Sequence, residues 1–336
     1  MKEILEKLVS GESLTQSETA GVFDQIMAGE ATSAQVGAIL AALRAKGETP
    51  EEIAGGATAM RNAAVRVDVG ELGVVDTCGT GGDGSQTFNI STVAALVTAG
   101  ADVPVAKHGN RSITSKCGSA DVLLELGVNL EVAPATVAKC IREAGIGFMF
   151  APKMHPAMKH AMGPRKELGI RTIFNMLGPL TNPAGAKRQV IGVFSPDLTE
   201  VFANVLKLLG STHVFVVHGA GLDEISTNTT TRISELVDGK VTSHEFDPRD
   251  IIGEFADRAA LAGGDAAENA DIAKNVLSGE KGSKRDIVCL NAAAAIVVGG
   301  KADNLAEGWE RAQESIDSGN AQKSLDAFIE VSNSGP

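Results

Sequence analysis

The sequence carries no excess of positive charge, and this lack excludes one broad class of function. Its 30 lysines and arginines stand against 42 aspartates and glutamates, a formal net charge of −12 at pH 7. Such a balance argues against general binding to nucleic acid or to an anionic membrane surface. Any affinity for phosphate must therefore be local, which suits the basic loop at residues 107–116.

Cysteines are few, and long apolar runs are missing. The four cysteines, at positions 78, 117, 140 and 289, show no C-x-x-C spacing, so neither a zinc site nor a disulfide framework is expected. Reduced thiols are the ordinary state in the cytosol. No apolar stretch reaches the ~18 residues of a membrane span, and the first residues lack the apolar run of a signal peptide. We therefore expect a cytoplasmic protein that has no membrane partner.

The first 65 residues carry only helical signals. Three capping boxes mark helix starts, at Thr15-x-x-Glu18, Thr32-x-x-Gln35 and Thr49-Pro-x-Glu52. One apolar stripe with helical spacing is formed by Val36, Ile39, Leu40 and Leu43. A strand-free segment of this length predicts a small N-terminal all-helical domain over residues 1–70.

From residue 74 onward, the pattern alternates between strands and helices, which is typical of a mostly parallel sheet flanked by helices. We expect strands at 74–78, 103–106, 146–150, 189–194 and 213–217, and a hairpin at 233–246 around Asp238-Gly239. Helices are expected from near Asn89 or Ser91 to Gly100, and at 120–126, 134–144, 197–209 and 286–298. The predicted fold class is α/β, with a larger α/β domain over residues 71–336 after the helical one.

Two strand-to-helix crossings between Val74 and Gly127 each carry a polar, glycine-bearing loop, Gly79-Thr-Gly-Gly-Asp-Gly84 and Lys107-His-Gly-Asn-Arg-Ser-Ile-Thr-Ser-Lys-Cys-Gly-Ser119. Glycines let a backbone approach a ligand closely, and helix N-terminal amides bind anions. Lys107, Arg111 and Lys116 add positive charge. Because such loops meet at the carboxyl ends of parallel strands, the pattern predicts a site for a ligand with several phosphates.

Other interpretations of the first loop are weaker. Gly79, Gly81 and Gly84 satisfy the dinucleotide signature G-x-G-x-x-G. That signature also requires an acid about 20 residues later, where this chain has Lys107 and His108. A Walker loop needs Gly-Lys-Ser/Thr, and Gly84 is followed by serine. A glycine-rich turn that binds no ligand is the structural alternative.

Longer motifs make the sequence recognisable. They are Gly79-Thr-Gly-Gly-Asp83, Thr87-Phe-Asn-Ile-Ser-Thr92, Lys107-His-Gly-Asn-Arg-Ser112, Pro156-Ala-Met-Lys-His160, Arg165-Lys-Glu-Leu-Gly-Ile-Arg-Thr-Ile-Phe-Asn175, Leu177-Gly-Pro-Leu-Thr-Asn-Pro183 and His218-Gly-Ala-Gly-Leu-Asp-Glu224. Together they closely resemble the anthranilate phosphoribosyltransferase family over nearly the whole chain. The resemblance implies transfer of phosphoribose from 5-phosphoribosyl 1-diphosphate to the amine of anthranilate, in tryptophan biosynthesis. It also implies a homodimer formed through the helical domain, which a later segment at about 165–185 joins.

Matched positions imply the residues that bind the phosphoribosyl donor. These are Gly79, Gly82, Asp83, Thr87, Asn89, Ile90, Ser91, Thr92, Lys107, His108, Gly109, Asn110, Arg111, Ser112, Ile113, Thr114, Ser115 and Ser119. Ser91, Asp223 and Glu224 match the ligands of two Mg²⁺ ions, a hard oxygen set that suits this metal. Taken alone, an Asp-Glu pair such as Asp223-Glu224 is more often a solvated acidic turn, and the preceding strand and the phosphate loops favour the metal site here.

The anthranilate positions are matched by Gly79, Asn110 and Arg165. A guanidinium pairs bidentately with a carboxylate, although Arg165 alone fits a solvated helix face. Because the donor carries its own leaving group, no single essential acid or base is expected. His108 is a candidate proton relay or a loop-packing histidine, and His155 and His160 are expected to line the aromatic side. Met154 and Cys117 depart from the residues that relatives carry there, which leaves the fine shape of the pocket open.

Three rival functions remain from the sequence: a pyrimidine nucleoside phosphorylase of the same fold, a non-catalytic relative that binds nucleic acid, and a nicotinamide dehydrogenase. The Lys107-His-Gly-Asn-Arg motif and Arg165 argue against the first. The acidic balance argues against the second, and the missing ribose acid against the third.

Overall fold

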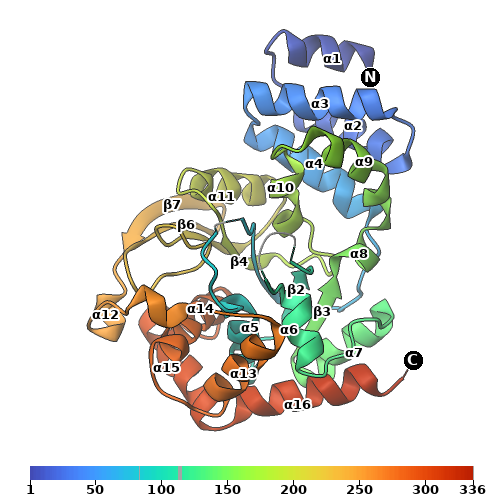
Figure 1. The fold of residues 1–336 in the computed structure, drawn as a ribbon. Helices are drawn as coiled ribbons and strands as arrows, with labels where there is room; N and C mark the ends of the chain where they lie inside the picture. Colours follow the sequence, from blue (N-terminus) through green and yellow to red (C-terminus); the bar gives the residue numbers. More distant parts are fainter. Residues whose placement is uncertain (83, 113–115, 336) are drawn as a thin grey trace.

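The computed structural model describes residues 1–82, 84–112 and 116–335. It has a helical region at the N-terminus and a larger α/β domain built on one sheet (Figure 1). This is the predicted fold class. Among the described residues, no helix combines the length and the apolarity that crossing a bilayer requires.

The N-terminal helices begin where the capping signals predict. They are α1 (Lys2–Val9), α2 (Gln16–Ala28), α3 (Ser33–Lys46) and α4 (Pro50–Ala63). All three capping boxes form, at Thr15, Thr32 and Thr49. The apolar stripe of α3 is buried in the core between the helices.

A later segment returns to these helices (Figure 1). It comprises α8 (Ala151–Met154), η1 (Pro156–Met158), α9 (Lys159–Leu168), α10 (Phe174–Leu177) and η2 (Gly178–Leu180). Helix α9 packs against α2 and α3, and α10 packs against α4, with the rings of Phe23 and Phe174 5.4 Å apart. Helix α9 ends at Gly169, whose φ of 62° stops it, and its residue Met162 is exposed.

One sheet of seven strands forms the centre of the larger domain. The strands are β1 (Val75–Gly79), β2 (Val105–Gly109), β3 (Ile146–Phe150), β4 (Arg188–Gly192), β5 (His213–His218), β6 (Thr231–Val237) and β7 (Lys240–Phe246), in the order β3-β2-β1-β4-β5-β6-β7. The first five in this order are parallel, and β6 and β7 form the predicted antiparallel hairpin. Its turn residues Asp238 and Gly239 have φ of 50° and 74°, the left-handed conformation that a two-residue hairpin turn needs.

Helices cover both faces of the sheet. They are α5 (Ile90–Gly100), α6 (Ser119–Glu125), α7 (Pro134–Ala144), α11 (Leu198–Leu208), α12 (Arg249–Ile252), η3 (Arg258–Leu261), α13 (Ala266–Leu277), α14 (Ser283–Val298), α15 (Leu305–Asp317) and α16 (Asn320–Asn333). Because side chains alternate along a strand, Val190 joins the core with α5 and α14, whereas Ile191 joins the core that reaches α11 and the N-terminal helices. Helix α14 is buried along most of its length. Near the carboxyl ends of β1 and β2, Cys78 and His108 lie close to the returning segment, at Pro179 and His155.

Candidate active site

The candidate site begins where two neighbouring strands end on paired glycines. Gly79 of β1 lies in register with Gly192 of β4, and the loop after β5 crosses above both. A Cβ atom at Gly192 would lie 1.5 Å from the carbonyl oxygen of Asp223, and one at Gly79 would lie 2.3 Å from Asp223 Oδ2. At Gly192 only glycine fits while the acidic loop keeps its path, and at Gly79 a larger residue would displace the Asp223 carboxylate. The pair therefore brings Asp223 and Glu224 to the carboxyl end of β1.

The two carboxylates of this loop accept hydrogen bonds from backbone amides, one in the first predicted phosphate loop and one in the first turn of α5. Asp223 Oδ2 accepts from Gly81 N at 2.8 Å, and Glu224 Oε1 accepts from Ser91 N at 3.1 Å. Ser91 lies in the first turn of α5, where amide groups and the helix dipole attract anions. The predicted metal ligands Ser91, Asp223 and Glu224 are thus brought together.

The ammonium group of Lys107 lies beneath this arrangement. Lys107 Nζ donates to the Thr77 carbonyl oxygen and lies 3.4 Å from both Thr77 Oγ1 and Ser91 Oγ. Burial lowers the pKa of Lys107, while the nearby carboxylate of Asp76 opposes the shift, with smaller contributions from Glu224 and Asp223. The Lys107 amine is thus buried beside Ser91, and in its protonated form it would attract a phosphate bound there.

The N-terminus of α5 supplies the next group of predicted donor residues. Asn89 is its N-cap residue, while Ile90 and Thr92 are buried beneath it. Thr87 forms an isolated bridge with Ala262, and its hydroxyl lies 3.2 Å from that of Ser85. The loop before α5 is therefore attached to the segment that precedes α13.

The second loop, after β2, is held by backbone contacts and by Asp121. Asp121 Oδ2 accepts from the amides of Gly118 and Ser112, at 2.9 and 3.3 Å. Ser119 Oγ donates to the Asn110 carbonyl oxygen at 3.2 Å, directly beside Gly109, where a Cβ would meet Ser119 Oγ at 2.4 Å. This loop places the predicted residues Gly109, Asn110, Ser112 and Ser119 next to one another.

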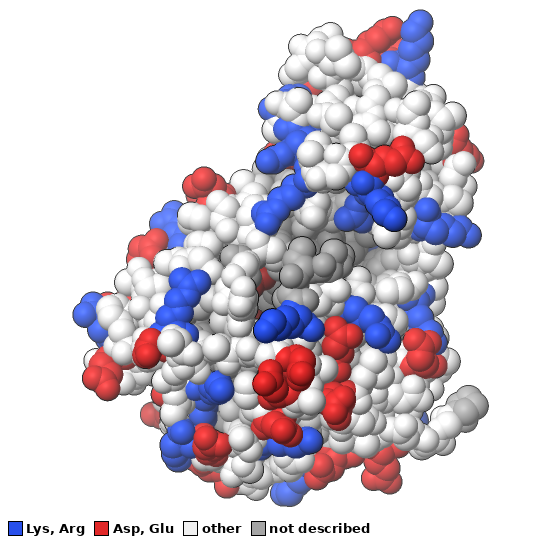
Figure 2. All heavy atoms as spheres, in the orientation of Figure 1, with Lys and Arg blue, Asp and Glu red and all other residues white. Residues whose placement is uncertain are grey.

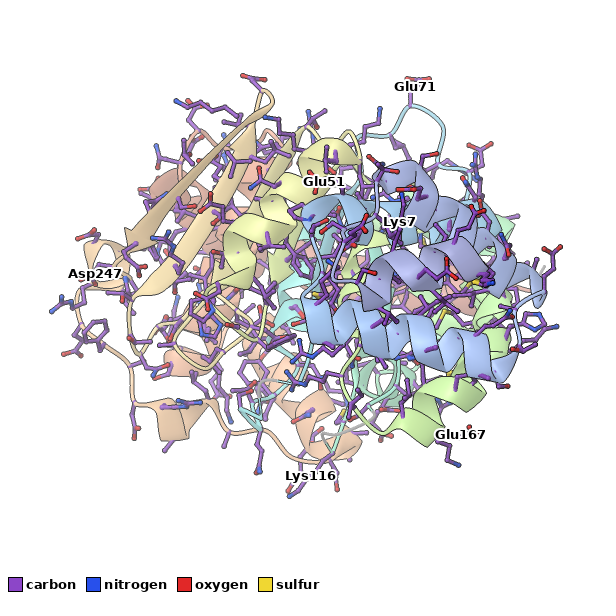
Figure 3. All side chains as sticks on the ribbon, turned by 90° about the horizontal axis from the view of Figure 1, so that it is seen from above. Lys7, Glu51, Glu71, Lys116, Glu167 and Asp247 are labelled. Carbon is purple, nitrogen blue, oxygen red and sulfur yellow. The ribbon has the colours of Figure 1, made fainter. Side chains whose placement is uncertain are left out.

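The two exposed cations of the second loop differ from Lys107. Arg111 lies 3.7 Å from Asp121 and 5.9 Å from the Phe150 ring centroid. Lys116 is exposed, and its side chain points outward at the edge of the molecule (Figure 3). The predicted donor residues Asp83, Ile113, Thr114 and Ser115 lie outside the described residues.

Two histidines meet on the side of the site near the returning segment. The rings of His108 and His155 are 5.0 Å apart and both are buried. Burial lowers the pKa of His108 to about 3 and that of His155 to about 4. Both imidazoles are therefore neutral near pH 7. His160 does not join them, contrary to expectation, because its exposed ring lies against Gly29 at the end of α2.

Arg165 lies on α9 and is half-buried. Its guanidinium stacks 5.0 Å from the Phe174 ring centroid, and burial lowers its pKa. Within the described part of the chain, no acidic side chain forms an ion pair with Arg165. A partly desolvated guanidinium of this kind binds a ligand carboxylate well. The partial burial of Arg165 and its stacking on Phe174 therefore argue against the interpretation of Arg165 as a solvated residue on a helix face.

Figure 2 shows lysine and arginine side chains on both sides of the hollow between the helical region and the larger domain. No group of three or more His, Cys, Asp or Glu side chains arranged to hold a metal occurs among the described residues. The two carboxylates and the Ser91 hydroxyl nevertheless fit Mg²⁺, which prefers one or two carboxylates together with substrate phosphates and water.

The sequence-based interpretation missed three residues that support the site. Asn269 and Asn291 are buried, on α13 and α14, and bond to Asn89 and to the backbone of Ile225. Arg171 Nη2 donates to the Gly82 carbonyl oxygen at 2.8 Å and its guanidinium stacks on Phe194. An asparagine inside the apolar run 286–298 was the one available signal, since a buried amide must find hydrogen-bonding partners.

Comparison with known proteins identifies the class of enzyme to which this chain belongs. Residues 71–322 match the glycosyl transferase family, a/b domain, and residues 2–64 match the helical bundle domain of the same family. The chain is therefore a glycosyltransferase with both parts that this family describes.

Individual relatives define the family more narrowly. The chain is 53% identical over 334 residues to an anthranilate phosphoribosyltransferase of Desulfosudis oleivorans, covering 99% of this chain and 98% of that one. A crystal structure of the Thermus thermophilus enzyme is 43% identical, with a TM-score of 0.92, covering 98% and 99% of the two chains. The Saccharomyces cerevisiae enzyme in complex with PRPP and Mg is 32% identical, with a TM-score of 0.89, covering 99% and 97%. The chain belongs to the anthranilate phosphoribosyltransferase family, which sets the three rival functions aside.

Proposed function

We propose that this chain transfers the phosphoribosyl group of 5-phosphoribosyl 1-diphosphate to the amine of anthranilate. The products are N-(5-phosphoribosyl)anthranilate and pyrophosphate, in the second step of tryptophan biosynthesis from chorismate. The observation that carries the proposal is the meeting of the glycine loop, the α5 N-terminus, buried Lys107 and two carboxylates at one point. Solved relatives with PRPP and Mg, and with 4-fluoroanthranilate, support the same substrates.

The reaction breaks the bond between ribose C1 and the diphosphate oxygen and forms a bond from C1 to the anthranilate nitrogen, which then loses a proton. Because diphosphate is a good leaving group, alignment and charge neutralisation provide most of the catalysis. In this proposal the amides of Gly81 and Ser91, together with Lys107, bind the phosphate oxygens, and their proximity supports that role. We expect the diphosphate to replace the carboxylates on these amides.

Two Mg²⁺ ions would be held by Ser91, Asp223 and Glu224, and when bound they would neutralise the departing diphosphate. The carboxylates already lie at Ser91 and at the glycine loop. Their hydrogen bonds to the Gly81 and Ser91 amides give these backbone donors partners.

Anthranilate would lie between Arg165, which pairs with its carboxylate, and the two glycine-bearing loops, where Gly79 of the first loop and Asn110 of the second complete the binding positions. The stacking of Arg165 on Phe174 holds the guanidinium plane in place. His108, whose pKa is about 3, is a weak base, so its role in this proposal is to shape the pocket or to pass on a proton that another group has already released. The aryl amine attacks without prior deprotonation.

We also propose that residues 1–70, joined by about 165–185, form a domain that mediates a homodimer, with residues 71–336 as the catalytic domain. Val9 on α1 and Met162 on α9 are 78% and 56% exposed, so the helical region offers apolar side chains to a partner. We expect the enzyme in the cytoplasm. Light scattering of the purified protein tests the dimer, which a monomeric mass at all concentrations would overturn.

The first experiment is an assay of anthranilate fluorescence with 5-phosphoribosyl 1-diphosphate, with and without Mg²⁺. We expect rapid loss of fluorescence that requires both the donor and the metal. If both ligands bind but fluorescence persists, the acceptor is a different aromatic amine. Failure of the donor to bind would overturn the assignment of both loops.

A further inference from the structure

Two buried asparagines on the C-terminal helices each contact one part of the site. Asn291, on α14, accepts from Ile225 N through Oδ1 and donates to the Ile225 carbonyl oxygen through Nδ2, both at 2.9 Å. Asn269, on α13, donates to Asn89 Oδ1 at 3.0 Å and accepts from Gly264 N at 2.8 Å. They are 3% and 2% exposed. Each therefore joins a rigid helix to a loop of the site.

The Asn291 contact acts directly on the acidic loop. Ile225 follows Glu224 in the chain. Because the Asn291 side-chain amide bonds to both the N–H and the carbonyl oxygen of Ile225, it fixes the orientation of the backbone at this residue. Asn291 Nδ2 also donates to the Ile287 carbonyl of its own helix at 2.9 Å, which fixes the amide rotamer. Asn291 and Glu224 line the same small cavity of ≈ 10 Å³ with Thr77 and Ser91, a space about large enough for one water.

The Asn269 contact acts on a different element. Asn89 is the N-cap residue of α5, and its side chain also contacts Cys117, with Cys117 Sγ 3.3 Å from Asn89 Oδ1. Asn269 also accepts a hydrogen bond from Gly264 N. The neighbouring Gly263 packs so closely on the loop before α5 that an added Cβ would lie 2.5 Å from Phe88 N. The amide thus connects α13 to the loop that precedes α5.

We infer that Asn291 is a positioning residue for the metal-binding carboxylates and Asn269 a positioning residue for the donor loop. The inference rests on the proposed function, because it assigns the acidic loop to Mg²⁺ and Asn89 to the donor. Groups behind metal ligands typically change metal affinity by about 10–100-fold when they are removed. Replacement of Asn291 should therefore change the Mg²⁺ requirement, whereas replacement of Asn269 should change the affinity for the donor.

The test uses Asn291→Leu and Asn269→Leu, which keep similar volume and lose the hydrogen bonds. For Asn291→Leu we expect the Mg²⁺ concentration for half-maximal activity to rise about tenfold, with donor affinity at saturating Mg²⁺ little changed. For Asn269→Leu we expect donor affinity to fall about fivefold, with the Mg²⁺ requirement unchanged. Calorimetric titration of the donor, at low and at saturating Mg²⁺, gives a second readout that does not depend on turnover.

Ser315→Ala is the matched control. Ser315 is buried on α15 and donates to the Val97 carbonyl oxygen at 2.7 Å, at the far end of α5 from Asn89. Its loss should lower the melting temperature and leave both affinities unchanged. If either leucine variant does not fold, Asn291→Asp and Asn269→Asp replace it, since each keeps the Oδ1 acceptor.

Equal changes in both quantities for the two variants, or a lowered melting temperature alone, would overturn the inference. The proposed function is tested separately by the unmodified enzyme. If that enzyme shows no Mg²⁺-dependent donor binding, the function fails. If it binds the donor and the variants match Ser315→Ala, only the positioning roles fail.

Discussion

The N-terminal helices and the active site are built from contacts of very different range. In the helices, each capping box joins residues three positions apart, as in Thr49 and Glu52. In the site, the defining bonds join Gly81 to Asp223 and Ser91 to Glu224, across 142 and 133 positions. Local contacts set where helices begin, whereas long-range contacts bring charges together. Substitutions in the first region should therefore change stability, and those in the second should change chemistry.

The largest effect is expected from removing both acidic charges. Asp223→Asn combined with Glu224→Gln should reduce turnover about 100-fold and raise the Mg²⁺ requirement, because neutral amides bind Mg²⁺ poorly. Steady-state assays across Mg²⁺ concentrations measure both quantities. Unchanged metal dependence would remove these residues from the site, and a matched Asp238→Asn change in the distant hairpin should have no effect.

A smaller change at the strand ends should act through the same loop. Gly192→Ala places a Cβ 1.5 Å from the Asp223 carbonyl oxygen, so the loop must move. Displacement of catalytic groups by about 1 Å can cost about 100-fold in rate, and we expect about a tenfold to 100-fold loss of kcat. The control is Gly37→Ala on α3, where a Cβ meets nothing within 4 Å. Equal activity of the two variants would contradict the proposed path of the loop.

On the acceptor side, Arg165→Ala should raise the KM for anthranilate about tenfold or more and leave that for the donor nearly unchanged. The reason is that a carboxylate loses its charged, bidentate partner. Its neighbour Lys166 is exposed, so Lys166→Ala serves as the control. Parallel increases in both KM values would argue that Arg165 supports the fold rather than anthranilate.

The buried histidines predict a dependence of stability on pH. The pKa of His155 falls from its ordinary value of 6.5 to about 4 in the folded protein. Between these values the unfolded chain binds more protons, so stability should increase as pH rises from about 4 to 6.5 and decrease as pH falls through the same window. Melting temperatures measured over this range test it. His155→Gln should reduce this slope, and an unchanged slope would contradict the burial of a neutral His155 in the folded protein.

The smallest effect is expected in the helical region. Thr49 Oγ1 accepts from Glu52 N at 3.3 Å, and Glu52 is itself buried. Removing such a cap typically costs about 1 kcal/mol. Thr49→Ala should therefore lower the free energy of unfolding by about that amount, as measured by denaturant titration, without changing kcat. A loss of activity without a loss of stability would contradict the expectation that substitutions in the N-terminal helices change stability and not chemistry.

Much of the fold could be predicted because its signals are local. The helix Pro134–Ala144 with its Gly145 stop, the strand Ile146–Phe150 and the Asp238-Gly239 hairpin all form as expected. The strand predicted at 103–106 instead runs over Val105–Gly109, because pairing with β3 extends it through polar residues that look like loop. Met154, taken as a pocket residue, is buried in a core cluster, and its carbonyl accepts from Val65 N. Cys117 does reach the site, through Asn89.

The amino-acid sequence by itself determined which segments become helices, strands and turns, because capping, periodicity and glycine φ act within a few residues. It also carried the motifs that identify the family. Only the tertiary structure decided that the acidic loop crosses Gly79 and Gly192, that Lys107 is buried beneath Ser91, and that Asn269 and Asn291 hold the loops. Those features depend on strand order and on packing between distant segments, which no local rule contains.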